Sequence, residues 1–205
     1  MPPPPPPLPP PPNPAPKAPH PKPSTTAQRT AALVNALTSH DPTADAADAD
    51  YAADAIGAVT EVLREHGEAE PIELSVQDIA DMRAVALKLR EVFAAEDVDS
   101  AAASLNRLLR LSPGPLRLTS HDGLTTWHPH LDSTDDAPWA EWLLASSCLA
   151  LTVLVWDRQR PPGGICASAS CRNVYVTQGS GLPRRYCSRR CATRERVAAH
   201  RRAHA

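Results

Sequence analysis

Four of the five cysteines in this chain lie close together near its C-terminal end. Four residues separate Cys166 from Cys171, three separate Cys187 from Cys191, and fifteen lie between the two pairs. Two short Cys pairs joined by a turn-rich stretch are typical of a tetrahedral zinc site, with each sulfur about 2.3 Å from the metal. The spacing therefore predicts one structural Zn²⁺ bound by all four cysteines. The alternative is two disulfides in a secreted domain.

The start of the chain favours zinc over disulfides. Met1 is followed by prolines, without the charged segment and apolar run of a signal peptide. We therefore expect a cytoplasmic protein, and the reducing cytosol favours zinc thiolates. The fifth cysteine, Cys148, lies in an apolar run and is expected to be a small buried hydrophobe. A composition rich in Ala and Arg but poor in Lys fits a GC-rich bacterial genome.

Basic residues surround and follow the second cysteine pair. From Asp157 to the end the chain has 11 Arg, no Lys and two acids, a net charge of +9, whereas residues 1–156 carry a net charge of −11. Ser188 is positioned to cap a helix that runs through Cys191 to about His204. The candidate nucleic-acid contacts are the basic residues on and just before this helix: Arg185, Arg189, Arg190, Arg194, Arg196, His200, Arg201 and Arg202.

The arginines of this helix have two interpretations. Arg190, Arg194 and Arg201 fall within about 40° of one another on a helix, and such a stripe resembles a surface that contacts phosphates. Alternatively, arginines beside the cysteines offset the charge of the zinc thiolate centre, and the basic face docks on the acidic body. We expect DNA as the partner. The alternative is a zinc-stabilised protein-interaction module without direct DNA binding.

The whole sequence divides into three parts. Residues 1–24 hold 15 of the 24 prolines, which favours a proline-rich disordered tail over residues 1–25. Residues 26–157 are expected to form a helical domain, and residues 158–205 the zinc finger with its Arg-rich helix. The predicted fold class is mainly α with a small β-hairpin, ending in a treble-clef-like or zinc-ribbon-like finger and a basic helix.

Apolar residues recur at helical spacing through the central part. Ser75 is expected to cap the clearest of these helices, whose apolar stripe runs from Ile79 to Phe93. The last helix holds thirteen uncharged residues, Leu143–Val155, fewer than the roughly 20 that span a bilayer. We therefore expect it to be the central core helix, without membrane contact. The other predicted helices cover residues 28–38, 50–66 and 99–111, and the last one covers residues 136–156.

Strands are expected in two places. Residues 116–119 and 124–127 are predicted to pair as a β-hairpin around an Asp-Gly turn. In the finger, residues 173–177 favour one strand, and a turn at residues 179–183 returns the chain to the second cysteine pair. Residues 158–164 are interpreted as a short Pro-Gly linker.

Histidines gather around the predicted hairpin. His121, His128 and His130 lie there with Asp122 and Asp132. Loop histidines beside a turn are usually exposed, so a second metal site is the minor interpretation of this group.

The cysteine segment resembles the bacterial CGNR zinc-finger proteins. The cysteine spacing matches their pattern, as do Arg185-Tyr186-Cys187-Ser188, the aromatic Tyr175 and the basic continuation of the helix. The signature itself departs, because Cys191-Ala192-Thr193-Arg194 stands where the family has Cys-Gly-Asn-Arg. The metal ligands are unaffected by this change, whereas any role of the missing Asn passes to Thr193 or is absent.

The resemblance extends less specifically to the body. In this family an ABATE domain precedes the finger, and Leu33-Val34-Asn35 stands where such domains have an Asn-Thr step. The family is described as stress-induced transcription regulators, so the resemblance implies a zinc-binding regulator that contacts DNA, with a protein partner or small-molecule effector for the helical domain. We expect no enzyme, since the chain has no Gly-rich phosphate loop, His-Glu-x-x-His motif or nucleophile elbow.

Overall fold

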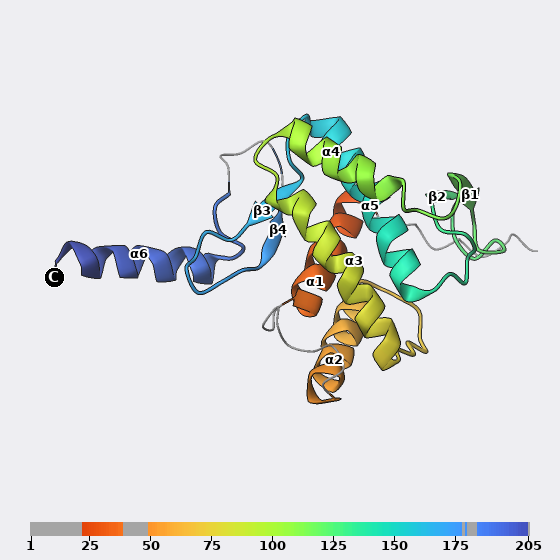
Figure 1. Ribbon diagram of the computed structural model, residues 1–205, viewed down its shortest axis with the longest axis horizontal. Helices are drawn as coiled ribbons and strands as arrows, with labels where there is room; N and C mark the ends of the chain where they lie inside the picture. Colours follow the sequence, from red (N-terminus) through yellow and green to blue (C-terminus); the bar gives the residue numbers. More distant parts are fainter. Residues whose placement is uncertain (1–21, 39–48, 178, 180–183, 205) are drawn as a thin grey trace, which may run out of the picture.

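Helices build most of the protein (Figure 1). The computed structural model describes residues 22–38, 49–177, 179 and 184–204. The helices are α1 (Pro23–Thr38), α2 (Ala49–Glu65), α3 (Val76–Ala94), α4 (Val98–Leu109), α5 (Trp139–Arg158) and α6 (Arg189–Ala203). Two antiparallel pairs join β1 (Arg117–Thr119) to β2 (His128–His130), and β3 (Gly163–Ile165) to β4 (Val174–Val176). The predicted class is confirmed: the fold is mainly helical, with a small hairpin, clustered C-terminal cysteines and a final helix.

Helix α5 occupies the centre of the body, as expected. It packs against α1, α3 and α4 and buries Leu143, Cys148 and Leu151. Cys148 is fully buried, and burial raises the pKa of its thiol to about 12, which fits the predicted inert core role. The same helix is long and apolar enough, by length and composition, to cross a membrane. Half of its apolar window is buried inside the protein, and core helices share that composition.

Polar side chains cap the first turns of two helices of the body, α3 and α4. Ser75 caps α3 as predicted: its hydroxyl accepts from the Asp78 N–H, and the Asp78 carboxylate accepts from the Ser75 N–H. Helix α4 begins one residue before the predicted start because Asp97 is the cap, its carboxylate accepting from the Ser100 N–H at 2.7 Å.

Helix α1 begins earlier than predicted. Its first residue is Pro23, inside the segment assigned to the proline-rich tail. Proline is tolerated in the first turn of a helix, where its missing N–H has no intrahelical partner to lose. The remainder of the predicted tail, residues 1–21, lies outside the described residues.

The second strand of the predicted hairpin was placed wrongly. Strand β2 is His128–His130, not residues 124–127, and its register pairs Thr119 with His128. The Asp-Gly turn does form, but the Gly123 and Thr125 N–H groups both donate to the Ser120 carbonyl. The chain therefore makes an additional turn before it pairs with β1. A longer loop results, and it brings histidines from both sides together.

The predicted linker also contains a strand. Gly163–Ile165 forms β3 and pairs with β4, which lies within the predicted strand 173–177. A side chain at Gly163 would not fit, because a Cβ there would lie 1.8 Å from the Tyr175 carbonyl oxygen and 2.9 Å from the Phe93 ring. This close approach fixes the finger hairpin against α3.

The finger and the body share one core. Val174 and Val176 of β4 belong to the same cluster of buried residues as α1, α3 and α5. The Asn35 side chain in α1 donates to the Val174 carbonyl at 3.0 Å and accepts from the Val174 N–H at 2.7 Å. These contacts continue across residue 157, where the sequence suggested a domain boundary.

Candidate metal centre and basic helix

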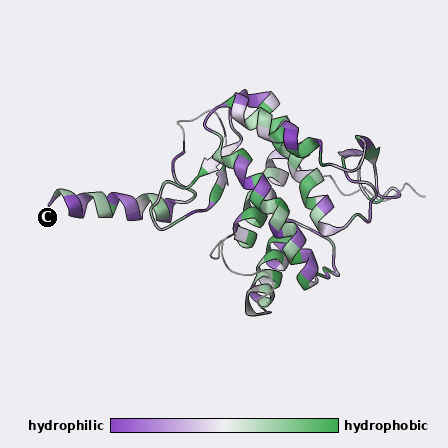
Figure 2. Cartoon of the chain, in the orientation of Figure 1, coloured by the Kyte–Doolittle hydropathy of each residue, from purple (hydrophilic) through white to green (hydrophobic). Residues whose placement is uncertain are grey.

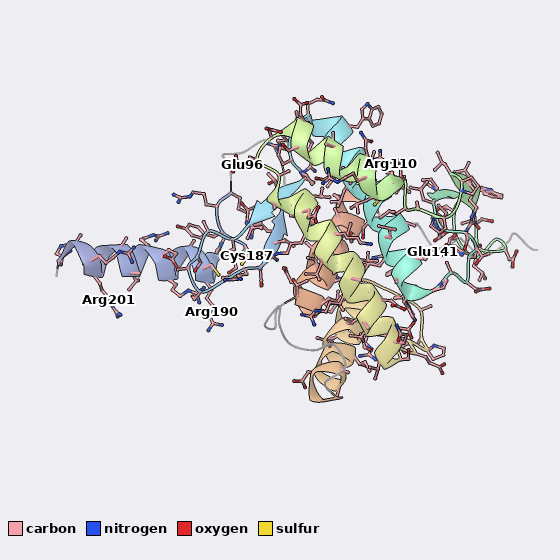
Figure 3. All side chains as sticks on the ribbon, in the orientation of Figure 1. Glu96, Arg110, Glu141, Cys187, Arg190 and Arg201 are labelled. Atoms are coloured by element: carbon pink, nitrogen blue, oxygen red, sulfur yellow. The ribbon has the colours of Figure 1, made fainter. Side chains whose placement is uncertain are left out.

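Four cysteine sulfurs converge at the base of α6, where Figure 3 labels Cys187. All four Sγ atoms lie within 4.8 Å of one another. Cys187 Sγ is 3.6 Å from Cys171 Sγ and 3.7 Å from Cys191 Sγ. Tetrahedral zinc with Zn–S bonds of about 2.3 Å requires S···S separations of about 3.8 Å. The cysteines are free rather than disulfide-bonded, and their geometry fits a structural zinc.

The first two ligands come from the turn that follows β3. The Cys166 N–H donates to the Asn173 carbonyl at 2.8 Å, which continues the β3–β4 pairing to the ligand. The Cys171 N–H donates to the Ser168 carbonyl at 2.9 Å and closes the turn. The Ala167 N–H donates to the backbone near the second pair, so the two halves of the site are held together by main-chain bonds as well.

The second pair comes from the N-terminal end of α6. Ser188 caps this helix as predicted, and its hydroxyl accepts from the Cys191 N–H at 3.2 Å. Hydrogen bonding to Ser188 lowers the pKa of Cys191 to about 7, whereas burial raises the pKa of Cys187 to about 12 and also raises that of Cys171. Protons must leave the thiols of Cys171 and Cys187 when zinc binds, so zinc affinity rises with pH.

Two residues of α6 turn back onto the metal centre. Arg194 donates to Cys191 Sγ at 3.4 Å and to the Ser168 hydroxyl at 2.9 Å. Glu195 accepts from the same hydroxyl at 2.7 Å and from the Ala169 N–H at 3.3 Å. Arg194 was predicted to contact nucleic acid; in the structure its side chain is exposed, and its hydrogen bonds are to one cysteine ligand and to Ser168. The sequence signal that was missed is Glu195, the one acid in a basic helix.

Helix α6 projects away from the rest of the protein, with the C-terminus at its far end (Figure 1). Among the described residues it contacts no other helix or strand, and Cys191 is its buried residue. Figure 2 shows hydrophilic residues along it. In the part of the chain that the structure describes, the basic face therefore does not dock on the helices of the acidic body. All seven predicted contact residues on this helix are exposed: Arg189, Arg190, Arg194, Arg196, His200, Arg201 and Arg202.

The exposed basic side chains have few partners in the structure. No salt bridge that joins described residues involves α6. Arg190 and Arg201 extend from the same side of the helix in Figure 3, as the predicted stripe requires. Arg185, just before the helix, is exposed with its guanidinium 5.8 Å from the Tyr186 ring, and the His200 ring lies 4.1 Å from that of His204.

Arg184 was not among the candidates and has a structural role. Its Nε donates to the Tyr186 carbonyl at 2.6 Å, and its terminal nitrogen donates to the Cys187 carbonyl. The guanidinium also lies 5.3 Å from the Tyr175 ring, whose hydroxyl donates to the Arg184 carbonyl. Arg184 thus braces the segment that leads into the second cysteine pair.

The strand, turn and helix described above define a four-cysteine zinc finger whose second ligand pair lies at a helix N-terminus. Residues 164–204 match a protein-family model, the CGNR zinc finger. The finger resemblance seen in the sequence is thereby confirmed, with the altered signature at Ala192 and Thr193 inside the match. No curated protein matches the chain. The similarity of the body to an ABATE domain stays a prediction.

A second group of potential ligands lies at the β1–β2 hairpin. The ligand atoms of His121, His128 and His130 lie within 4.8 Å of one another. Asp132 contacts this group, as its position in the sequence suggested, whereas Asp122 is exposed. Asp135, which the sequence did not single out, contacts His121 instead.

Proposed function

We propose that this protein is a cytoplasmic, zinc-dependent transcription regulator that contacts DNA through α6. The observation that carries the proposal is the position of this helix: it is fixed at its N-terminal end by the metal centre and projects into solvent with exposed arginines. Because α6 is basic and does not pack on the acidic body, its positive surface is available to an anionic partner.

The dimensions of α6 suit a DNA groove. Its 15 residues span about 22 Å at 1.5 Å per residue. The major groove of B-form DNA is about 12 Å wide and admits an α-helix. The stripe of Arg190 and Arg201 would contact phosphates, which supply most of the affinity in such complexes. The zinc has no catalytic role in this proposal, because four cysteines fill its coordination positions.

Salt titration tests the proposal. In fluorescence anisotropy with duplex DNA, affinity should fall steeply as salt rises, because bound cations are released from the phosphates. Arg190→Gln and Arg201→Gln should each reduce the slope of log K against log salt by about 1. The matched control is Arg110→Gln, an exposed arginine on the body at the end of α4, which should leave the slope unchanged.

Two further results bear on the same proposal. Cys187→Ser should remove both the zinc and DNA binding, because α6 would lose its anchor. Binding that does not depend on salt, or that survives loss of both α6 arginines unchanged, would contradict the proposal.

The second candidate is a protein-interaction module. It is favoured by exposed apolar side chains around the β1–β2 hairpin, at the end of the protein away from α6: Leu116, Leu118, Leu124 and Trp127. Genome-wide footprinting of the tagged protein separates the candidates. Discrete protected sites would support the regulator, and their absence together with recovery of a protein partner would support the module. In either candidate function, the helical body would bind a protein partner or a small-molecule effector.

A further inference from the structure

Three histidines converge from two sides of the β1–β2 hairpin. His128 and His130 are two residues apart in β2, so their side chains lie on the same face of the strand. His121 reaches them from the turn after β1, where its backbone has a φ of +46°. That left-handed conformation is uncommon for a residue with a side chain, and it directs His121 toward the other two rings.

The spacing of the ring nitrogens is that of a metal site. His128 Nε2 lies 3.3 Å from His121 Nε2 and 3.0 Å from His130 Nε2. Tetrahedral zinc with Zn–N bonds of 2.0–2.1 Å requires N···N separations of about 3.3 Å. His128 Nε2 therefore lies at metal-ligand spacing from the Nε2 atoms of the other two rings, and the ligand atoms of all three residues lie within 4.8 Å of one another.

The outer nitrogens of two rings determine their protonation. His130 Nδ1 faces both carboxylate oxygens of Asp132, at 2.8 and 2.9 Å. His128 Nδ1 faces the Thr126 carbonyl oxygen at 2.8 Å. Carboxylates and carbonyls only accept hydrogen bonds, so Nδ1 must carry the proton in each ring. In a neutral imidazole the lone pair is then on Nε2, the atom that faces the centre.

The third ring follows the same logic. His121 Nδ1 lies 3.2 Å from Asp135 Oδ2, an ion-pair contact that favours the proton on Nδ1 and the lone pair on Nε2. Three lone pairs that face one another at these distances repel unless a cation lies between them. The pattern of histidine Nδ1–H bonded to carboxylate or carbonyl, with Nε2 inward, is the one that orients histidines around metals.

The carboxylates are themselves held in place. Asp132 is 2% exposed and accepts from Arg117 at 2.8 Å. Asp135 accepts from Arg117 at 2.6 Å and from the Thr119 hydroxyl at 2.7 Å. Two carboxylates with one guanidinium leave a net charge of −1 around three neutral rings, which favours a bound cation.

We infer that His121, His128 and His130 bind one divalent zinc-type transition metal in the helical body, separate from the four-cysteine centre. Three imidazoles leave a fourth position for water or an external ligand, and the partial exposure of His121 gives that position access to solvent. The inference does not depend on DNA binding by α6.

A shared proton is the competing occupant of the centre. One imidazolium could donate from Nε2 to a neighbouring ring. A proton shared in this way joins only two of the three rings, whereas one metal ion can accept the Nε2 lone pairs of all three.

Metal content of the full chain is the first test. Protein purified with zinc present and passed over a desalting column should contain two zinc ions per chain by mass spectrometry of the metal. His128→Gln and His130→Gln should each contain one. The matched control is His66→Gln, whose Nδ1 also faces a backbone carbonyl, that of Val62 at 2.9 Å, and which should keep two. One zinc per chain in the unmodified protein would overturn the inference.

Cobalt identifies the ligands of the second ion. Co²⁺ added to protein whose cysteine centre already holds zinc should give visible d–d bands that saturate at one equivalent, without the near-ultraviolet bands of cobalt thiolates. His128→Gln should abolish these bands. Thiolate bands, or identical titrations for the variant and the unmodified protein, would overturn the inference.

A milder variant guards against misfolding. If His128→Gln unfolds the protein, Asp135→Asn should still fold and should weaken Co²⁺ binding by about 10- to 100-fold, because it removes the acceptor that orients His121. Circular dichroism and retention of the cysteine-bound zinc report folding in each variant. Unchanged Co²⁺ affinity in folded Asp135→Asn would contradict the arrangement described here.

Discussion

Arg194 supplies positive charge to the metal centre at the distance of a hydrogen bond. A zinc bound by four thiolates carries a net charge of −2, and the Arg194 guanidinium lies 3.4 Å from Cys191 Sγ. Its second bond, to the Ser168 hydroxyl, ties α6 to the turn that holds the first ligand pair. The sequence suggested charge compensation by arginines beside the cysteines such as Arg172, Arg184 and Arg185, whereas the hydrogen bond to a cysteine sulfur comes from Arg194.

Arg194→Gln should therefore loosen the zinc without removing it. The four cysteines remain, so the variant should still hold zinc at the finger, but transfer to a competing chelator should be about 10-fold faster because an oriented partner of the ligands is lost. A chelator competition assay followed by absorbance measures this rate.

Arg196→Gln is the matched control, since Arg196 is exposed and none of the hydrogen bonds between described residues joins it to a cysteine. It should leave the transfer rate unchanged. Equal rates for the two variants would show that Arg194 does not support the site.

At this scale the sequence predicted ligand types better than side-chain directions. The cysteine positions followed from spacing alone, because short intervals force pairs of sulfurs together. The contacts of the Arg194 side chain could not be predicted in this way. Helical angles relate residues on one helix to one another, and not to a turn elsewhere in the chain. The His121 contact with Asp135 required the left-handed backbone at His121, which no spacing encodes.

Strand β4 is attached to helix α1 through one amide side chain. Asn35 satisfies both backbone groups of Val174 and so takes the place of a neighbouring strand along that edge. Val174 and Val176 add apolar contacts to the shared core on the same side. The finger therefore depends on α1 for its position, although more than a hundred residues separate them in sequence.

Asn35→Ala should destabilise this attachment. Two partly buried backbone groups would lose their partner, at a cost of about 1–3 kcal/mol in the free energy of unfolding. Thermal or urea unfolding measures the change, and the cysteine-bound zinc should be retained because no ligand is touched.

Asn106→Ala serves as the control, because Asn106 is exposed on α4 and should have an effect close to zero. If Asn35→Ala is equally neutral, the apolar contacts of β4 alone hold the finger on the body.

Helices were easier to predict than strands for a physical reason. The stripes of α2 and α3 and the cap at Ser75 are local signals, and those elements lie within one or two residues of their predictions. Strand β3 has two glycines and no alternation, so its pairing depends on close contact with Tyr175 and Phe93, which are distant in sequence. Strand β2 begins later in the chain than predicted, because the turn at Ser120 lengthens the loop between β1 and β2.

The two candidate sites lie at opposite ends of the protein (Figure 1). The cysteine centre and α6 form one end, and the β1–β2 hairpin with its histidines forms the other. Between them lies the core of α1, α3, α4 and α5. The sequence predicted the cysteine ligands and gave a histidine site only as the minor interpretation. It did not predict how far apart the two groups lie, because that distance depends on how the helices pack.

This separation predicts how the protein responds to chelation. Removing zinc should raise amide hydrogen exchange in α6 and in both cysteine turns, because α6 contributes only Cys191 to the buried interior of the described structure. Helices α3 and α5 should stay protected, since their apolar faces pack in the body and do not contain metal ligands. Hydrogen exchange with mass spectrometry of the full chain resolves these segments.

Amide exchange in the β1–β2 hairpin then shows whether the protein binds one metal ion or two. If the histidines hold a second ion, chelation should also raise exchange over residues 120–130, and His128→Gln should show that higher exchange before any chelator is added. The His66→Gln control should behave as the unmodified protein does. If α5 instead loses its protection together with α6, the metal at the cysteines stabilises the entire core. The stability of the helical body would then depend on the zinc finger.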